Sequence, residues 1–434
     1  MHIYFSGIGG TAIGPLALIA HKAGFQVSGS DKQESQYIQY LRKQGVTDIH
    51  IGQSYEQIAQ THQEQAIDWF VYTSALPMEQ PDAPELRFCA ENAIRTSKRD
   101  EFLNHFLGQQ KLQMIAIAGT HGKTTTTAMT IWLFKQLGLP ISYSVGAKMS
   151  FGDMGEYNPE STYFVYEADE FDRNFLSFEP RMAIITGIDY DHPDIYPTLE
   201  SYNQAFHEFL EQSEAAILWQ DDAERLKLQV AKRQMVISKD NPDIDAQVRL
   251  PGLVNRQDAW IVARAIHSLT DIDMETLIGH LNAFPGVGRR FEQIIPNLYS
   301  DYAHTPPKIR GALQIGREVA SSKNLVVVYE GLHNTRQHFI QEELRDLFAD
   351  VQRLYIVPSY LAREDPDLPL WSPQDLRNLM TPEIQQRTVP VALDNQLATA
   401  LDNHLENGDV VLCITAGGGG SLDEWLRQNF TEKK

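Results

Sequence analysis

The segment GTHGKTTTT combines residue types that bind phosphate groups. Gly119 and Gly122 let successive backbone N–H groups turn toward phosphate oxygens, and Lys123 can reach the terminal phosphates. The Thr124 hydroxyl can ligate Mg²⁺. Ile117 stands where the general nucleotide-loop pattern has its first glycine, so the match is to the shorter form G-T-x-G-K-T-T. We expect ATP here; a glycine-rich turn without a ligand is disfavoured, because G-K-T-T lies between a strand-like run and a helical pattern.

Two acidic clusters follow this loop, each after an apolar run that predicts a strand. The first cluster is EADEFD, with Glu167, Asp169, Glu170 and Asp172, and the second is DYDHPD, with Asp189, Asp191, His192 and Asp194. Open α/β sheets place their ligand crevice at the carboxyl ends of the strands, and Mg²⁺ prefers hard oxygen ligands. Either cluster alone is equally compatible with a solvated acidic loop. Because both follow one phosphate loop, we expect a magnesium site.

The N-terminal segment GIGGTAIG carries a second glycine-rich pattern. Gly7, Gly9 and Ala12 fit G-x-G-x-x-[G/A] after a strand-like run, and Asp31 follows the second apolar run. Read alone, this weak signal indicates a dinucleotide such as NAD.

Three strand-like runs lead into glycine-rich segments, namely HIYFS, MIAIA and DVVLCIT. Short apolar runs that alternate with helical patterns predict βαβ units and parallel sheets, so we expect an α/β protein of three units. A polar segment, His105–Gln113, suggests the first boundary, and a new strand begins after Arg290. The predicted domains are 1–108, 109–295 and 296–434.

The composition excludes several classes of protein. The chain of 434 residues has a net charge of −20, which disfavours binding to nucleic acid. Its two cysteines, Cys89 and Cys413, cannot form a disulfide framework, so we expect a cytoplasmic protein. The sequence lacks a run of about 18 apolar residues, so we expect no membrane insertion. The oligomeric state is not indicated.

The motifs together resemble those of the Mur ligases along essentially the whole chain. The segments that carry the likeness are GIGGTAIG, VSGSD, YTSALP, GTHGKTTTT, EADEFD, DYDHPD, LPGLVNRQDA, GVGRRFE and DYAHTP. The resemblance is to the alanine-adding members. It implies a Rossmann-like N-terminal domain for a UDP-sugar, a central P-loop domain for ATP and a Rossmann-like C-terminal domain for the amino acid. The implied reaction is ATP-dependent joining of L-alanine to the lactyl carboxylate of UDP-N-acetylmuramate through an acyl phosphate, in peptidoglycan precursor synthesis.

The resemblance also implies roles for individual residues. The implied catalytic residues are Lys123, Glu167, His192 and Arg290, and the implied ligands of Mg²⁺ are Thr124, Glu167 and His192. The residues expected to bind ATP are Gly119, Thr120, His121, Gly122, Lys123, Thr124, Thr125, Asn255, Asp258, Arg290 and Asp301. Among these, Arg290 would face the γ-phosphate and Asn255 the adenine.

The two other substrates have their own implied residues. The UDP-sugar is expected at Gly7, Ile8, Gly9, Gly10, Asp31 and Ser74, with the helix N-terminus on the diphosphate. The amino acid is expected at Tyr302, His304, His333 and Arg336; a surface ion pair is the alternative for Arg336. His192 and His304 are candidates for the base that deprotonates the amine, and an ordinary hydrogen-bonded histidine is equally compatible with each.

Four positions depart from the family pattern. Gly187 and Asp258 replace asparagines, His333 replaces the first arginine of an H-R-x-[ST]-R stretch and leaves Arg336, and TAGGGGSLDEWL is unusually rich in glycine. The run EGLHNTRQ also resembles ligases that attach a recycled tripeptide, L-Ala-γ-D-Glu-diaminopimelate, so a tripeptide or another amino acid is the alternative substrate.

Three other classes fit the sequence less well. A nicotinamide-dependent oxidoreductase leaves GTHGKTTTT unexplained, and a folylpolyglutamate-type ligase would not begin with a Rossmann loop. A nucleotide sensor without catalysis is compatible with Gly187 and Asp258.

Overall fold

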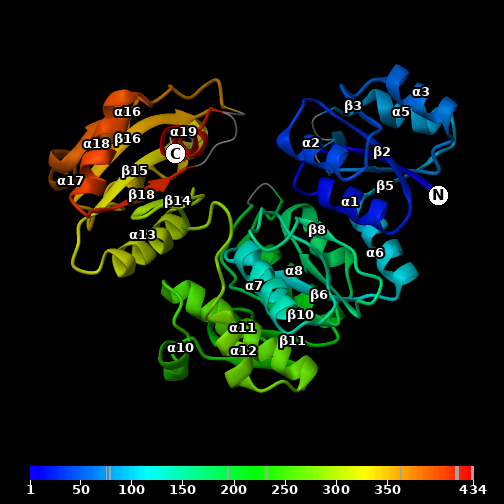
Figure 1. The fold of residues 1–434 in the computed structure, drawn as a ribbon, viewed down its shortest axis with the longest axis horizontal. Helices are drawn as coiled ribbons and strands as arrows, with labels where there is room; N and C mark the ends of the chain where they lie inside the picture. Colours follow the sequence, from blue (N-terminus) through cyan, green and yellow to red (C-terminus); the bar gives the residue numbers. More distant parts are fainter. Residues whose placement is uncertain are drawn as a thin grey trace. The chain divides into compact units, whose positions relative to one another are not determined.

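The computed structural model describes residues 1–74, 76–77, 80–192, 195–229, 233–361, 364–415 and 420–431. The chain divides into two compact units, coloured along the sequence in Figure 1. The first unit comprises Met1–Val248 and Gln257–Phe284, and the second comprises Arg249–Arg256 and Pro285–Lys434. Two sheets belong to the first unit and one to the second.

The first sheet has five parallel strands in the order β3-β2-β1-β4-β5. Its strands are β1 (His2–Ser6), β2 (Gln26–Asp31), β3 (Ile49–Ile51), β4 (Trp69–Tyr72) and β5 (Arg95–Lys98). Its helices are α1 (Gly14–Lys22), α2 (Gln36–Lys43), α3 (Tyr55–Glu64), α5 (Pro84–Glu91) and α6 (Arg99–Gln110). Strand order reverses between β1 and β4, and such a switch point is where open α/β sheets bind ligands.

The second sheet has seven strands in the order β12-β11-β10-β6-β9-β7-β8, and only β8 is antiparallel to its neighbour. Its strands are β6 (Gln113–Ala118), β7 (Ser142–Ser144), β8 (Gly155–Glu156), β9 (Tyr163–Glu167), β10 (Met182–Ile185), β11 (Ala216–Trp219) and β12 (Gln234–Ile237). Its helices are α7 (Lys123–Gln136), the 3₁₀ helix η1 (Phe171–Ser177), α8 (Leu199–Gln212), α9 (Gln220–Arg225), α10 (Pro242–Gln247), α11 (Leu253–Thr270) and α12 (Met274–Leu281). Because β6 lies between β9 and β10, the phosphate loop and both acidic clusters leave the sheet side by side.

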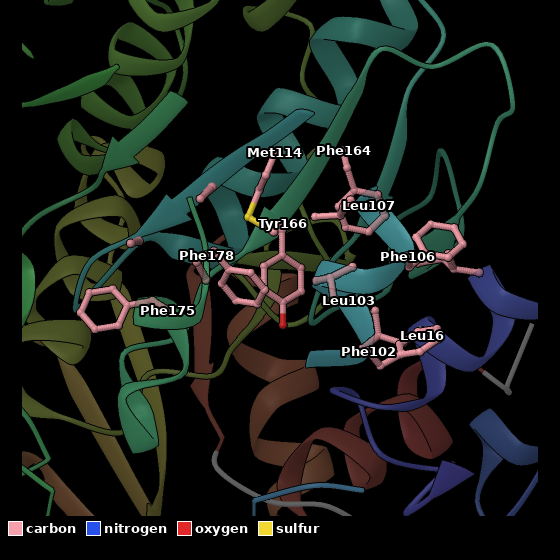
Figure 2. Packing of buried hydrophobic residues seen from close by; sticks show 14 of the residues in the cluster. Leu16, Phe102, Leu103, Phe106, Leu107, Met114, Phe164, Tyr166, Phe175 and Phe178 are labelled. Atoms are coloured by element: carbon pink, nitrogen blue, oxygen red, sulfur yellow. The ribbon is translucent and has the colours of Figure 1, made fainter. Parts of the chain in front are cut away.

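A hydrophobic cluster joins the two sheets of the first unit (Figure 2). The cluster contains side chains of β1 and α1 from the first sheet's layers and of β10 and α8 from the second's. Between them lie side chains of α6, β6, β9 and the segment after β9, namely Phe102, Leu103, Phe106, Leu107, Met114, Phe164, Tyr166, Phe175 and Phe178. Burying each such side chain stabilises the fold by about 1.5–3 kcal/mol. The cluster fixes α6, which follows β5 of the first sheet, against the strand that delivers Glu167.

The third sheet has six strands in the order β13-β14-β18-β15-β16-β17. Its strands are β13 (Glu292–Ile295), β14 (Leu298–Asp301), β15 (Leu325–Leu332), β16 (Arg353–Tyr360), β17 (Thr388–Pro390) and β18 (Val410–Ile414). Its helices are α13 (Pro306–Ala320), α14 (Asn334–Phe339), α15 (Gln341–Leu344), α16 (Pro373–Leu379), α17 (Pro382–Arg387), α18 (Asn395–Glu406) and α19 (Leu422–Phe430). Only β13 runs antiparallel to its partner.

The α/β class expected from the sequence is confirmed, with one predominantly parallel sheet for each expected domain. The exact boundaries stay a prediction: α6 (Arg99–Gln110) spans the first one, and β13 (Glu292–Ile295) pairs with a strand that follows the second. Among the residues that the structure describes, every helix falls short of the length and apolarity that a membrane span requires.

Candidate active site

The phosphate loop connects β6 to α7 and depends on its two glycines. Gly119 has φ +131°, and a Cβ there would lie 2.4 Å from the Thr186 hydroxyl oxygen. Gly122 has φ +80° and forms the N-cap of α7. A side chain at either position would be strained or would clash, so this loop conformation requires glycine. Thr125 lies in the first turn of α7, and its side chain is half-buried.

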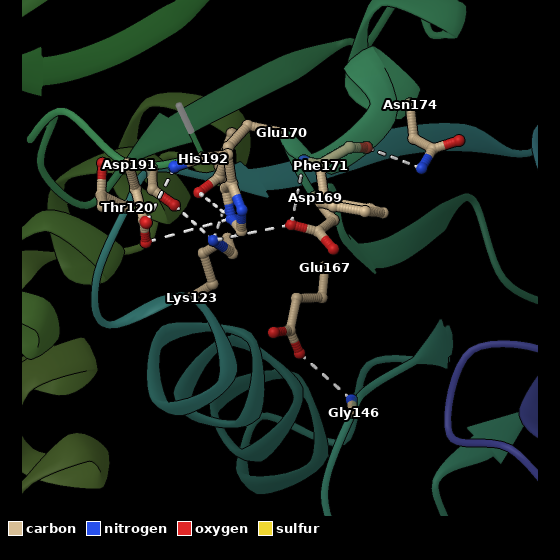
Figure 3. A network of polar contacts seen from close by, with 12 residues as sticks. Thr120, Lys123, Gly146, Glu167, Asp169, Glu170, Phe171, Asn174, Asp191 and His192 are labelled. Carbon is tan, nitrogen blue, oxygen red and sulfur yellow. Dashed lines mark hydrogen bonds and ion pairs between the residues drawn. The ribbon is translucent and has the colours of Figure 1, made fainter. Parts of the chain in front are cut away.

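Lys123 is held by a buried carboxylate (Figure 3). Its Nζ donates hydrogen bonds to Glu170 Oε2 and to the Gly119 carbonyl, each at 2.6 Å, and lies 3.9 Å from Asp169. The Glu170 side chain is only 1% exposed. Burial acts to lower the pKa of Lys123, but the charges of Glu170 and Asp169 outweigh it and raise the pKa. Lys123 therefore carries its positive charge at neutral pH.

Thr124 and Glu167 form a second contact at the loop. The Thr124 hydroxyl donates to Glu167 Oε1 at 2.8 Å, and Gly146 N–H donates to the other carboxylate oxygen at 3.1 Å. Glu167 ends β9, next to β6, so the sheet register brings it to the first turn of α7. A hydroxyl beside a carboxylate is a set of hard oxygen donors that fits Mg²⁺.

His192 lies beside the Lys123–Glu170 pair. Its Nε2 is 3.9 Å from Glu170 Oε1 and 4.0 Å from Asp191 Oδ2, and its ring packs edge-to-face on Phe171. The residue has φ +56°, a strained conformation for a non-glycine residue. The acidic side chains nearest the His192 ring are thus those of Glu170 and Asp191.

Within the part of the chain that the structure describes, protein groups alone do not form a complete metal site. The described ranges contain no group of three or more His, Cys, Asp or Glu side chains arranged to hold a metal ion. Thr124 and Glu167 are together, whereas His192 belongs to the neighbouring Glu170 contact. Asp194 of the second acidic cluster lies outside the described residues.

Thr120 and His121 connect the loop to the end of β10. The Thr120 hydroxyl donates to the Asp189 carbonyl at 2.7 Å and accepts the Asp189 N–H at 2.8 Å. His121 Nε2 lies 3.4 Å from the Asp189 carboxylate, and hydrogen bonds from His121 and Arg225 lower the pKa of Asp189. Asp189 of the second acidic cluster therefore stabilises the phosphate loop through its contacts with Thr120 and His121, and its carboxylate stays ionised.

Asp258 lies against the turn that begins α7. Its side chain is 3% exposed, and a Cβ on Gly122 would lie 3.0 Å from its Oδ2. Burial raises the pKa of Asp258 to about 8, although a hydrogen bond from Thr126 and the charge of Lys239 both act to lower it. Asn255 belongs to the second compact unit, where its side-chain amide donates to the Pro251 carbonyl at 2.8 Å.

The backbone N–H groups of the N-terminal glycine-rich loop donate hydrogen bonds to other residues of the same domain. Gly7 and Ile8 N–H donate to the Ser30 carbonyl at 2.8 and 3.0 Å, and Gly10 N–H donates to the Gly7 carbonyl at 3.0 Å. Gly9 N–H donates to Asp31 Oδ2 at 2.8 Å. Of the four glycine-loop residues expected to bind the UDP-sugar, all four N–H groups are thus engaged within the domain.

Ser74 follows β4, beside β1. It is buried, and its hydroxyl lowers the pKa of Asp172, although burial acts in the opposite direction. Asp172 also accepts a hydrogen bond from Lys98 Nζ at 2.7 Å. Ser74 is therefore close to the first acidic cluster. Ala75 of the TSALP turn lies outside the described residues.

A cluster in the second unit brings together four predicted residues. Phe291 N–H donates to Asp301 Oδ2 at 2.7 Å, and the Arg290 guanidinium lies 5.2 Å from the centre of the Tyr302 ring. Burial raises the pKa of Asp301 to about 6, and Arg290 opposes this shift. His304 Nδ1 lies 3.0 Å from the Tyr302 carbonyl.

His304 is neutral at physiological pH. Burial lowers its pKa to about 3, and the charges of Lys308, Arg336 and Arg290 act in the same direction. Nδ1–H then donates to the Tyr302 carbonyl, which leaves Nε2 as an acceptor.

His333 and Arg336 lie at the carboxyl end of β15. His333 Nδ1 is 3.6 Å from Glu364 Oε1, and Thr335 donates to Glu364 Oε2 through both its N–H, at 2.9 Å, and its hydroxyl, at 3.3 Å. Arg336 is half-buried, and its charge acts to lower the pKa of His304. The glycines at 417–419 in TAGGGGSLDEWL lie outside the described residues.

Sequence reasoning did not assign several partners of these residues. Glu170 was recognised only as one member of an acidic cluster, and Lys98 and Glu364 carried no signal. Each reaches its partner across a long stretch of chain, 47 residues for Lys123–Glu170 and 74 for Lys98–Asp172.

Comparison with protein families matches most of the chain. Residues 2–111 match a model described as "Mur ligase family, catalytic domain", residues 117–250 match "Mur ligase middle domain", and residues 289–417 match "Mur ligase, glutamate ligase domain".

Two curated relatives share the name UDP-N-acetylmuramate–L-alanine ligase. The protein from Legionella pneumophila (strain Corby) is 29% identical over 99% of this chain and 96% of its own. The protein from Nitrosomonas eutropha is 28% identical over 98% of this chain and 97% of its own.

Two solved structures share the fold. UDP-N-acetylmuramate-alanine ligase from Thermotoga maritima has a TM-score of 0.76 at 23% identity and covers 100% of this chain and 99% of its own. A murein peptide ligase from Psychrobacter arcticus has a TM-score of 0.63 at 20% identity and covers 99% of this chain and 98% of its own.

Proposed function

Because the chain belongs to the Mur ligase family of ATP-dependent amide-bond-forming ligases, we propose a specific reaction for it. In this reaction the protein joins L-alanine to the lactyl carboxylate of UDP-N-acetylmuramate. This reaction would place it in the cytoplasm, in peptidoglycan precursor synthesis. The observation that carries the proposal is the pair of contacts at the phosphate loop, Lys123 with Glu170 and Thr124 with Glu167. The names of the two curated relatives support the choice of substrates.

The proposed reaction replaces the poor leaving group of a carboxylate, its oxygen, with a good one, phosphate. A carboxylate does not react with an amine at neutral pH, so ATP first phosphorylates the lactyl carboxylate to an acyl phosphate. The amine then attacks the acyl carbon, and the tetrahedral intermediate expels phosphate. Catalysis of phosphoryl transfer consists mainly of positioning and charge stabilisation.

The phosphate loop supplies that charge stabilisation. Lys123 offers a fixed positive charge to the γ-phosphate, which would otherwise repel the approaching carboxylate. Thr124 and Glu167 would hold Mg²⁺, which when bound neutralises phosphate charge. His192 is the proposed third ligand, beside Glu170. We extend the assignment to Asn255 near the adenine and to Arg290 and Asp301 near the phosphates.

The UDP-sugar is proposed to bind at the carboxyl ends of β1 and β4. Because the N–H groups of Gly7–Gly10 are engaged internally, the diphosphate would be met by the N–H groups at 11–13, which lead into α1. A helix N-terminus attracts phosphate through such groups and through its dipole. This proposal corresponds to three functional domains, 1–108, 109–295 and 296–434.

The amino acid is proposed to bind at Tyr302, His304, His333 and Arg336. Arg336 would bind the α-carboxylate, since a guanidinium forms strong bonds with that group. His304 Nε2 can accept a hydrogen bond from the amine and orient it. With a pKa of about 3, however, His304 is a weak base.

A second candidate substrate is a tripeptide. The observation in its favour is Glu364, whose carboxylate contacts His333 and Thr335 beside the proposed pocket. A carboxylate there suits an acceptor with a further ammonium group, such as the side chain of a diaminopimelate residue.

Phosphate release would test the proposal. The assay contains ATP, Mg²⁺ and UDP-N-acetylmuramate and compares L-alanine, L-serine, glycine and the tripeptide as acceptors. L-Alanine-dependent release supports the main proposal, and tripeptide-dependent release supports the second. Lys123→Ala should abolish turnover; activity in that variant would overturn the assignment of the phosphate loop.

A further inference from the structure

A buried carboxylate lies beneath the N-terminal glycine-rich loop. Glu85 belongs to α5 and is 1% exposed. Its Oε1 accepts hydrogen bonds from the hydroxyls of Tyr4 at 3.1 Å and Ser30 at 2.5 Å, and its Oε2 accepts one from Ser6 at 2.6 Å. One side chain thus binds the carboxyl ends of two adjacent strands, β1 and β2.

These two strand ends carry the loop directly. Ser6 is the last residue of β1, and Gly7 follows it. The Ser30 carbonyl accepts the N–H groups of Gly7 and Ile8, and Asp31, the next residue, accepts the N–H of Gly9. Any displacement of Ser6 or Ser30 therefore moves the loop amides.

The hydrogen-bond directions continue outward from Glu85. Because the Ser6 hydroxyl donates to Glu85, its oxygen is left to accept, and Gln53 Nε2 donates to it at 2.8 Å. Gln53 follows β3, at the same carboxyl edge of the sheet. The carboxylate thus fixes the orientation of a glutamine amide as well as the loop.

Such a buried carboxylate is costly in a fold. Burial raises the pKa of Glu85, and three hydroxyl donors only partly offset this shift. His50 also acts to lower the pKa of Glu85, and its Nε2 lies 2.9 Å from the Thr61 hydroxyl and 3.2 Å from Asp48. An apolar side chain would fill the space without a desolvation cost, so the group is better explained by what it positions.

We propose that Glu85 is a positioning residue for the UDP-sugar, which acts through Ser6 and Ser30 to hold the glycine-rich loop and through Ser6 to orient Gln53. This inference rests on the proposed function, in which the N–H groups at 11–13, which directly follow that loop, meet the diphosphate of the UDP-sugar. Glu85 itself is too deeply buried to touch the substrate.

Steady-state kinetics on the full-length enzyme test the inference. Glu85→Ala should raise the KM for UDP-N-acetylmuramate about tenfold or more, while the KM for ATP changes less than about twofold. Glu91→Gln is the matched control: Glu91 lies on the same helix, is exposed and accepts a hydrogen bond from Tyr55. Equal effects on both KM values, or no effect on either, would overturn the inference.

Hydrogen exchange provides a readout that needs no ligand. In Glu85→Ala the amides of Gly7, Ile8 and Gly9 should exchange faster, while those of β6 keep their wild-type rates. Unchanged exchange would overturn the inference. If Glu85→Ala shows this pattern but the wild type binds no UDP-N-acetylmuramate, the proposed function fails and the role of Glu85 in holding the loop stands. Should Glu85→Ala not fold, Ser6→Ala and Ser30→Ala each remove one hydrogen bond to Glu85, and Ser6→Ala also removes the bond from Gln53. Each variant should show the same two effects to a smaller degree.

Discussion

Lys123 Nζ lies 2.6 Å from Glu170 Oε2, and Glu170 is almost fully buried. The lysine that would meet the γ-phosphate is thus held by a carboxylate. An incoming triphosphate competes with Glu170 for the same ammonium group. The contact pre-orients Lys123, and its strength opposes nucleotide binding.

Glu170→Gln should therefore destabilise the free enzyme and increase stabilisation by ATP. Breaking one side of a buried ion pair costs about 3–5 kcal/mol, because the remaining charge loses its partner. The triphosphate restores a partner to Lys123, so the rise in Tm on adding ATP should be larger than in the wild type. Thermal unfolding with and without ATP measures both effects, and an ATP-induced rise equal to or below that of the wild type would contradict the prediction.

Glu167→Gln should raise the Mg²⁺ requirement. The substitution keeps an oxygen that can accept from the Thr124 hydroxyl but removes the negative charge that attracts the cation. The Mg²⁺ concentration for half-maximal phosphate release should rise about tenfold or more. Glu160→Gln, in an exposed turn before the same strand, is the control and should keep the wild-type requirement. An unchanged requirement in Glu167→Gln would remove this residue from the metal site.

The sequence contained enough information to place Lys123, Thr124 and Glu167, because these residues follow strand ends, whereas the pairing of Lys123 with Glu170 is seen only in the structure. Lys123 and Thr124 begin a helix after one apolar run, and Glu167 ends the next strand in space, so periodicity and sheet topology suffice. Glu85 and Glu364 carry no such pattern. Their roles depend on contacts across 79 and 29 residues, from Ser6 to Glu85 and from Thr335 to Glu364, which local pattern does not encode.

Asp258 should make stability depend on pH. Its pKa is about 8 in the folded protein and near the ordinary value of 3.8 when unfolded. The folded state thus holds a proton that the unfolded state has lost, and stability falls as pH rises from about 4 to 8. One such proton corresponds to about 1.4 kcal/mol per pH unit.

Asp258→Asn removes this titration. In urea unfolding at pH 5.5, 6.5, 7.5 and 9, the variant should gain stability relative to the wild type as pH rises, and the difference should level off above pH 8. Asp222→Asn is the comparison: burial also raises the pKa of Asp222, but its carboxylate accepts the Ile188 N–H at 3.0 Å, which opposes that shift, so the same trend should be smaller. A difference between Asp258→Asn and the wild type that is the same at every pH would show that Asp258 is ionised throughout.

Substitutions of Arg336 and Glu364 should change the use of the amino-acid substrate and leave the KM for ATP nearly unchanged. Losing a charge-assisted bond to a carboxylate costs about 1.5–3 kcal/mol, so Arg336→Ala should raise the KM for L-alanine about 10- to 100-fold and leave the KM for ATP within about twofold. Arg345→Ala is the matched control, because the Arg345 side chain is 61% exposed.

Glu364→Gln should lower activity with the tripeptide relative to L-alanine if the carboxylate receives an ammonium group. Equal changes in the KM for ATP and L-alanine would place Arg336 outside the pocket, and an unchanged ranking of acceptors would leave Glu364 with only its role of anchoring Thr335.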